Sequence, residues 1–188
     1  MIIYLITKYT IDRFSEHDKI KHELLNLIQN SESERLEQND EYYGDNVARL
    51  DWHKSKDNLR PWVKYFLPYF KNQVSKMVYE LGFEQCDTAA LWYQQYEENS
   101  THGWHTHSQN YTGVYYLEMP EGTPKTQLVD ENKNVEIVDL DVNEGDFIIF
   151  PSFVIHRAPK NLSKDRKTII SFNIDVSNIR KDILDRLK

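Results

Sequence analysis

Four of the seven histidines of this chain lie between residues 102 and 156, and two of them form an H-x-H pair. Side chains two residues apart in a strand point to the same face, so His105 and His107 could converge on one metal ion. His102 is an odd number of residues from both and is expected to point elsewhere. His156 follows the apolar run at 145–151 and is the candidate third ligand. An H-x-H pair by itself is more typical of two surface histidines.

A cationic residue follows the distal histidine by ten positions. Arg166 immediately precedes a strand expected at Thr168–Ile174, so Arg166 and Thr168 should share one face of that strand. A guanidinium and a hydroxyl on one face suit a carboxylate ligand, because Arg offers a fixed fork of donors and Thr adds one more. The alternative is a surface arginine at the start of a strand.

Short strands separated by Gly and Pro must position these residues. Such a series favours a sandwich, jelly roll or barrel over a parallel sheet. If Tyr96 faces the interior, Trp92 and Gln94 face it too, whereas Tyr115 and Tyr116 fall on opposite faces. The expected strands are Thr88–Tyr96, Thr112–Glu118, Thr126–Val129, Val135–Leu140, Asp146–Phe150 and Thr168–Ile174.

The first half of the chain has a helical pattern after an apolar strand at its N-terminus. Ser15 is the expected cap of a helix that runs to about Gln29. A second helix should begin near Pro61 and end at Gly82, and Pro68 is expected to kink it or divide it in two. Residues 31–58 are polar and are predicted to be an irregular connection. A short polar helix is expected at 178–187.

Composition narrows the remaining choices. The chain has 188 residues, one Cys and a formal net charge of −7, which excludes a disulfide-stapled fold and a Cys-rich zinc site. The acidic balance disfavours binding to nucleic acid. We expect one cytoplasmic domain without a membrane span, with a helical part at 1–87 packed on a jelly-roll core at 88–176. The other histidines, His17, His22 and His53, are expected at the surface.

The ordered motifs resemble those of the Fe(II)- and 2-oxoglutarate-dependent oxygenases, and most of all the small ones of phages and marine bacteria. Tyr96 precedes His105 by nine residues, His107 precedes His156 by 49, and Arg166 follows by ten. The phrases Thr112–Leu117, Gly145–Ser152 and Ser171–Asn173 are also similar to that subgroup.

The resemblance implies a double-stranded β-helix, a distorted jelly roll with helices outside one sheet. It implies that His105 and His156 are iron ligands, and that Arg166 binds the distal carboxylate of 2-oxoglutarate with support from Thr168 and Tyr96. The implied reaction hydroxylates a substrate and releases succinate and CO2. Substrate-side candidates are Trp92, Gln94, Trp104 and Asn173, with core packing as the alternative role for Trp92.

One position departs from the family pattern. His107 stands where the family has a carboxylate ligand, so the predicted Fe(II) site is His105, His107 and His156, unless an acid completes it. Glu97, Glu98 and Asp130 are the acids to inspect.

Other functions and substrates stay open. A cupin-like three-His metalloprotein without 2-oxoglutarate is one alternative, a non-enzymatic jelly-roll binding module is another, and a zinc hydrolase is a third. The substrate class and the oligomeric state are undetermined. A basic cluster beside the expected site leaves an anionic small molecule open as the substrate. Its members are Arg157, Lys160, Lys164, Arg166 and Lys167.

Overall fold

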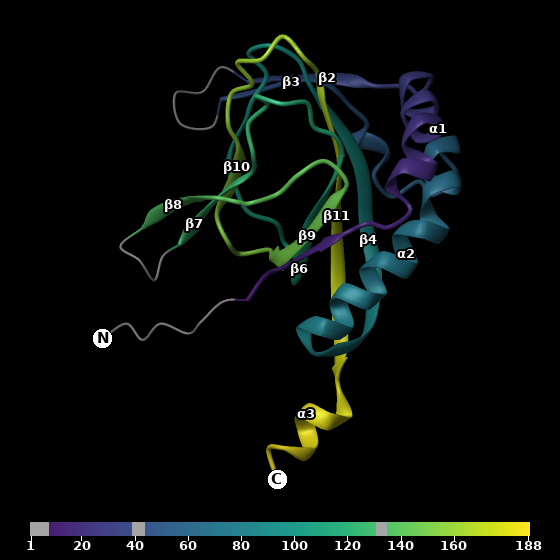
Figure 1. Cartoon of the computed structure of the whole chain (residues 1–188), viewed down its shortest axis with the longest axis vertical. Coiled ribbons are helices and arrows are strands. Elements are labelled where there is room, and N and C mark those ends of the chain that lie inside the picture. The colour runs from purple at the N-terminus through teal and green to yellow at the C-terminus, as the bar shows by residue number, and fades with distance from the viewer. Residues whose placement is uncertain (1–7, 39–43, 131–134) are drawn as a thin grey trace.

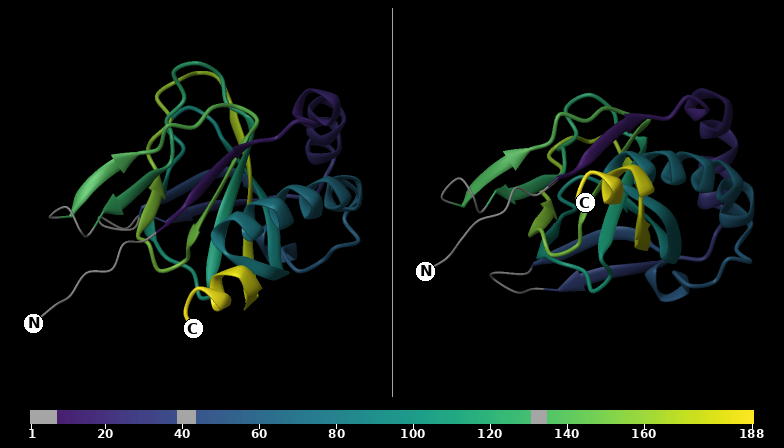
Figure 2. Two further views of the ribbon diagram at one scale, coloured as in Figure 1. Left: turned by 60° about the horizontal axis from the view of Figure 1, so that its bottom comes forward. Right: turned by 90° about the horizontal axis from the view of Figure 1, so that it is seen from below.

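The computed structural model describes residues 8–38, 44–130 and 135–188. The strand expected at 1–6 lies outside these ranges. The described chain folds into two antiparallel sheets that face each other, with helices covering the outer face of the larger sheet (Figures 1 and 2). This is the double-stranded β-helix that the sequence predicts.

The larger sheet has seven strands in the order β1-β9-β6-β11-β4-β3-β2. Its centre is the long antiparallel pair of β4 and β11, which is flanked by β6 and β9. The strands are β1 (Thr10–Arg13), β2 (Glu34–Gln38), β3 (Asp45–Leu50), β4 (Phe83–Tyr96), β6 (Tyr111–Glu118), β9 (Asp146–Pro151) and β11 (Lys167–Ile179).

The smaller sheet has four strands in the order β5-β10-β7-β8. It consists of β5 (His102–His105), β7 (Gln127–Asp130), β8 (Glu136–Asp139) and β10 (His156–Ala158). The strands expected at 88–96, 112–118, 126–129, 135–140, 146–150 and 168–174 all form, although several are longer or shorter than predicted.

Helices α1 (His17–Gln29) and α2 (Pro61–Leu81) pack their apolar faces on the larger sheet (Figure 1). They enclose a core that includes Phe66, Phe70 and Phe147. A second core fills the space between the two sheets and includes Tyr116, Ile148 and Ile169. The short helix α3 (Lys181–Asp185) follows β11. No helix in the described parts of the chain has the length and apolar character needed to cross a bilayer.

Several sequence predictions about the first half need correction. Residues 31–58 are not irregular, because they form β2, β3 and the 3-10 helix η1 (Trp52–Lys54). Helix α2 continues through Pro68 instead of dividing. Helix α1 begins after Glu16, with no side-chain cap from Ser15. The N-terminal part, predicted as helical, therefore also adds three strands to the larger sheet.

His17, expected at the surface, is buried at 2% exposure. Its Nδ1 lies 2.7 Å from the Tyr115 hydroxyl, and its Nε2 lies 3.3 Å from Glu144 Oε1. His22 and His53 are exposed, as predicted. A buried histidine with two polar partners at the start of α1 fixes that helix against β6 and the turn before β9.

Candidate active site

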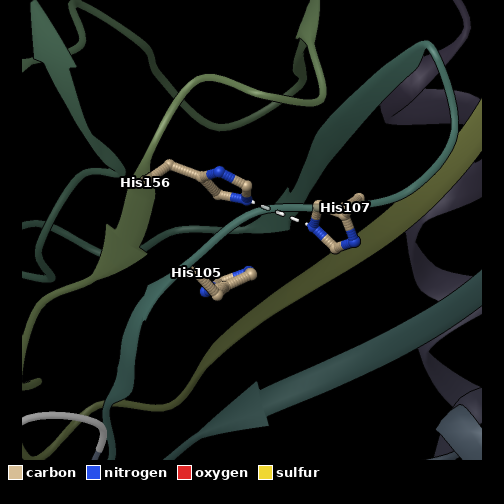
Figure 3. A group of neighbouring side chains, drawn as sticks. All are labelled: His105, His107 and His156. Atoms are coloured by element: carbon tan, nitrogen blue, oxygen red, sulfur yellow. Dashed lines mark hydrogen bonds between the residues drawn. The ribbon is translucent and has the colours of Figure 1, made fainter. Parts of the chain in front are cut away.

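Three of the predicted ligands meet in the space between the sheets (Figure 3). His105 ends β5 and His156 begins β10, and the two residues are paired across these antiparallel strands. His107 lies two residues beyond the end of β5 and is held by a 3.0 Å hydrogen bond from its backbone N–H to Ser152 O. One ring nitrogen from each residue lies within 4.8 Å of the others. The spacing prediction for these three residues is confirmed as a cluster.

Backbone carbonyls fix the orientation of two of these rings. His105 Nδ1 donates to Gly103 O at 2.7 Å, and His156 Nδ1 donates to Val154 O at 2.9 Å. A carbonyl only accepts, so each Nδ1 carries the proton and each Nε2 keeps a lone pair. The Nε2 atoms of His107 and His156 are 3.2 Å apart. This is the arrangement expected of histidines prepared to bind a metal.

Burial keeps the cluster uncharged. Desolvation, together with the nearby His105, lowers the pKa of His107 to about 4. Desolvation also lowers the pKa of His105 and of His156. Neutral imidazoles at physiological pH are metal ligands, whereas protonated ones are not.

A fourth histidine lies beside the cluster, contrary to the sequence prediction. The ring of His102 stacks on that of His105, with centroids 4.0 Å apart and planes 21° apart. The register between β5 and β10 shifts here: His156 pairs with His105, but Ala158 pairs with His102. The extra residue in β5 reverses the alternation, so two histidines three positions apart share a face. Parity counting from the sequence failed because it assumed a regular strand.

The predicted parity of β4 is confirmed. Trp92, Gln94 and Tyr96 line the pocket that contains the histidines. Trp92 is 3% exposed, and its ring centroid lies 6.0 Å from that of His107. The Gln94 carboxamide accepts a hydrogen bond from Ser171 Oγ at 2.9 Å, and its nitrogen lies 3.2 Å from His102 Nδ1.

Trp104 points away from the pocket. The guanidinium of Arg157 lies over its ring at 4.3 Å. Arg157 in turn donates through Nε to Gln127 Oε1 at 2.7 Å. Trp104 and Arg157 adjoin His105 and His156 along their strands, so they occupy the opposite, outer face of the smaller sheet. The structure therefore does not support Trp104 as a residue beside the substrate.

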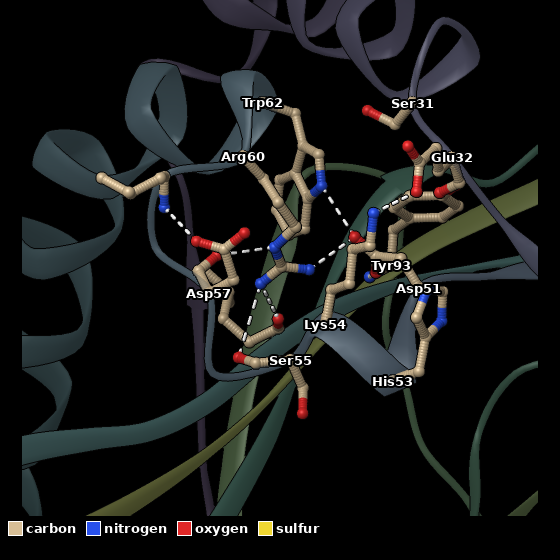
Figure 4. A network of polar contacts seen from close by, with 12 residues as sticks. Ser31, Glu32, Asp51, His53, Lys54, Ser55, Asp57, Arg60, Trp62 and Tyr93 are labelled. Carbon is tan, nitrogen blue, oxygen red and sulfur yellow. Dashed lines mark hydrogen bonds and ion pairs between the residues drawn. The ribbon is translucent and has the colours of Figure 1, made fainter.

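A buried polar network holds the segment beside Trp92 in place (Figure 4). The Asp51 carboxylate accepts hydrogen bonds from Arg60, from Trp62 Nε1 at 2.9 Å and from the backbone N–H of Tyr93 at 2.9 Å. Arg60 also donates to Leu91 O at 2.6 Å. The residues on both sides of Trp92 are thus tied to the loop after β3, along the edge of β4 that faces away from β11 and that β3 no longer covers.

Arg166 and Thr168 share a face, as predicted, but it is the outer one. Arg166 donates to both oxygens of Glu118, at 2.8 and 3.2 Å, and to Gln29 of α1 at 3.1 Å. Thr168 donates to Glu118 Oε2 at 2.7 Å. The guanidinium expected at 2-oxoglutarate is therefore committed to a carboxylate on the helix side of the sheet.

The cation that enters the interior is the next residue, Lys167. It is 1% exposed, and its Nζ donates to Pro124 O at 2.7 Å and lies 5.0 Å from the centroid of the Tyr96 ring. Within the described ranges no carboxylate forms an ion pair with it. Burial lowers the pKa of Lys167 to about 7. Sequence reasoning missed Lys167 because it chose Arg166 by its spacing from His156, and the spacing does not show which face of β11 lies inside.

None of the three acids considered as ligands joins the cluster. Glu97 and Glu98 are exposed beyond the end of β4, and Asp130 ends β7. In the described part of the chain, the only group able to hold a metal consists of His105, His107 and His156.

Comparison with known proteins agrees with this site. The family model described as "Putative 2OG-Fe(II) oxygenase" matches residues 90–173, a range that contains the three clustered histidines and Lys167. The matched segment is therefore similar to the Fe(II)- and 2-oxoglutarate-dependent oxygenases. Fe(II) and 2-oxoglutarate are the cofactor and cosubstrate that the name of this family model gives, and the three clustered histidines could hold such a metal. A search of curated proteins finds no significant match to this chain.

Solved structures share the fold of this chain at low sequence identity. A prolyl-4-hydroxylase from Pseudomonas putida is 12% identical, with a TM-score of 0.61 over 90% of this chain and 93% of that one. A 2OG-Fe(II) family oxidoreductase from Burkholderia pseudomallei is 10% identical, with a TM-score of 0.66 over 92% and 87%. The epimerase SnoN of nogalamycin biosynthesis, solved with Fe3+ and alpha-ketoglutarate, is 12% identical, with a TM-score of 0.67 over 90% and 79%.

Proposed function

We propose that this chain is an Fe(II)- and 2-oxoglutarate-dependent oxygenase that hydroxylates its substrate at a site where His105, His107 and His156 hold Fe(II) and Lys167 anchors 2-oxoglutarate. The observation that carries the proposal is the convergence of three neutral imidazoles. Backbone carbonyls hold the Nδ1 atoms of His105 and His156 and the backbone N–H of His107. When bound, Fe(II) and 2-oxoglutarate supply the activation of O2, with release of succinate and CO2. The protein contributes orientation and a pocket sheltered from water.

His107 takes the place of the usual carboxylate in this proposal. Two histidines and one carboxylate are the common ligands of non-haem Fe(II) oxygenases. A third neutral imidazole leaves the metal centre one charge unit more positive, which favours a dianionic cosubstrate. The absence of an acid from the cluster of described residues supports His107 as the third ligand.

Lys167 replaces Arg166 as the group that binds the distal carboxylate. A buried cation without a carboxylate partner is costly, and an anionic ligand removes that cost. The Tyr96 hydroxyl is a second donor on the same side, since Tyr96 also faces the pocket. Arg166 and Thr168 then act structurally by tying β11 to Glu118 at the end of β6.

Two adjacent residues provide a matched test. We expect Lys167→Ala to abolish 2-oxoglutarate binding in calorimetry with Mn(II), while metal binding persists. Arg166→Ala should bind 2-oxoglutarate like the wild type, although it should be less stable. Succinate formation from Fe(II), 2-oxoglutarate and air should follow the same pattern. Loss of 2-oxoglutarate binding in Arg166→Ala but not in Lys167→Ala would refute the assignment.

A cupin-like metalloprotein without 2-oxoglutarate is the second candidate, and the outward position of Arg166 favours it. It predicts metal binding with no 2-oxoglutarate binding by the wild-type chain. Lys167 supports the oxygenase assignment instead, because it supplies a buried cation within the segment where one was expected. A cytoplasmic location is part of our proposal and is supported by the single Cys.

A further inference from the structure

The inner row of β11 passes along the pocket, which Ile169 and Ser171 line. Lys167, Ile169, Ser171 and Asn173 share the inner face, while Phe172 and Ile174 belong to the core under the helices. Lys167 and Asn173 are six residues apart, which is roughly 20 Å along a strand. If 2-oxoglutarate takes the Lys167 end, as proposed above, the Asn173 end remains for the substrate.

Asn173 carries an unusual polar group for a buried position. It is 2% exposed, and its Oδ1 has no hydrogen-bond partner among the described residues. Burying a carbonyl oxygen without a partner is unfavourable, so such a group next to the pocket-lining Ser171 is one that a ligand can satisfy. Its register partners are Ala90 on β4 and Thr112 on β6, and Thr112 lines the pocket.

The same end of the pocket is aromatic. Trp92 is paired with Ser171, one step along the inner face from Asn173. The exposed ring of Trp52 meets Trp92 edge-on, with centroids 4.4 Å apart, and extends this apolar surface outward. A flat substrate group can therefore lie against the indole of Trp92 while a polar group of the same substrate contacts Asn173.

The pocket offers little to a charged substrate. No Asp or Glu is among the described residues that line it. Arg157 lines it, but its guanidinium lies over Trp104 and its Nε is bonded to Gln127 on the outer face. The nearest charged residues along β11 and β4 are the exposed pair Asp175 and Asp87, which are acidic. The anionic substrate that the basic cluster left open is therefore disfavoured.

We infer that Asn173 is a substrate-recognition residue whose Oδ1 accepts a hydrogen bond from an uncharged amide N–H of the substrate. This inference rests on the proposed function in one respect only: 2-oxoglutarate binds at the Lys167 end of β11, which leaves the Asn173 end for the substrate. It assigns the substrate class as a neutral amide attached to a flat or apolar group.

The first test compares two buried asparagines. Asn161 is 0% exposed, and its carboxamide is fully used: it donates to Tyr96 O and Asp165 O and accepts from Ser163 N. Thermal unfolding of the full chain should show a lower Tm for Asn161→Leu and an unchanged or higher Tm for Asn173→Leu. A drop in Tm for Asn173→Leu as large as that for Asn161→Leu would mean that Asn173 is structural and would overturn the inference.

The second test uses benzamide as the probe, followed by NMR at the indole N–H of Trp92, which Trp92→Phe identifies. We expect benzamide to bind, and N,N-dimethylbenzamide and benzoate to bind at least about ten-fold more weakly, as the loss of one hydrogen bond implies. Asn173→Leu should weaken benzamide binding by a similar factor. No binding, or equal binding of the three probes, would overturn the inference.

These measurements are made on the metal-free chain and repeated with Zn(II) and 2-oxoglutarate. Failure of the proposed function would appear separately, as absent 2-oxoglutarate binding in calorimetry with an intact benzamide response.

Discussion

At the scale of single residues, one position along β11 decides which cation serves the site. Arg166 and Lys167 are neighbours, yet one is bonded to Glu118 beneath the helices and the other is buried between the sheets. Alternation along a strand sends adjacent side chains to opposite faces. A register error of one residue in a sequence-based prediction therefore exchanges a structural residue for a ligand-binding one.

The lowered pKa of Lys167 gives 2-oxoglutarate binding a predicted pH dependence. Burial lowers its pKa from the ordinary 10.5 to about 7, so the Lys167 side chain of the ligand-free protein is largely uncharged at pH 8. A carboxylate partner favours the ammonium form. Binding should therefore take up a proton near pH 8, and affinity should fall up to about ten-fold per pH unit above 7. Calorimetry in buffers of different ionisation enthalpy measures this uptake, and Arg166→Ala should retain it.

His107 allows a direct test of the three-histidine site. We expect His107→Ala to weaken Fe(II) or Co(II) binding by more than about 100-fold. Loss of a residue that only hydrogen-bonds to a metal ligand typically weakens binding about 10- to 100-fold, and loss of a ligand itself should cost more. His107→Asp should restore much of that affinity, because it recreates two histidines and a carboxylate. Metal titration followed by absorption spectroscopy measures both. Wild-type affinity in His107→Ala would show that His107 is not a ligand.

At the scale of elements, the loop that follows β3 determines how β4 presents Trp92. Strand β3 pairs with β4 only at Gln94 and Gln95, and beyond that point Asp51, Ser55 and Arg60 satisfy the backbone of β4. The sequence pattern of residues 31–58 did not reveal this, because polar side chains bonded to a strand edge look the same in sequence as solvated ones.

The buried Asp51–Arg60 pair should be sensitive to removal of one partner. Asp51 is 1% exposed and Arg60 is 7% exposed. Arg60→Ala leaves a buried carboxylate without its cation, which costs about 3–5 kcal/mol. We expect chemical denaturation to show a loss of that order. Lys19→Ala, which removes an exposed pair with Glu16, should change the stability far less, because solvent screens that pair. Similar losses for both variants would contradict the role given to the network.

At the scale of the whole molecule, the fold brings β5 and β10 together although more than 50 residues separate His105 from His156. A metal that binds only the assembled cluster should stabilise the folded chain. At a free metal concentration 100 times Kd, the gain is about 2.7 kcal/mol.

In a chain of this size, that gain raises Tm by roughly 5–10 °C. Scanning calorimetry with Zn(II) should show this rise in the wild type and in His53→Ala, whose histidine lies outside the site. The rise should disappear in His105→Ala and in His156→Ala. An undiminished rise in those two variants would place the metal elsewhere.

The sequence by itself determined the order of chemical groups and the class of fold. The spacing of His105, His107 and His156 and the succession of short strands were sufficient, because ligand type and strand periodicity are local properties. Only the tertiary structure decided that His102 stacks on the cluster, that Lys167 and not Arg166 faces the interior, and that Trp104 points outward. Each depends on which face of a strand a residue occupies, and a bulge or a one-residue shift in register, set by pairing with distant strands, reverses that face.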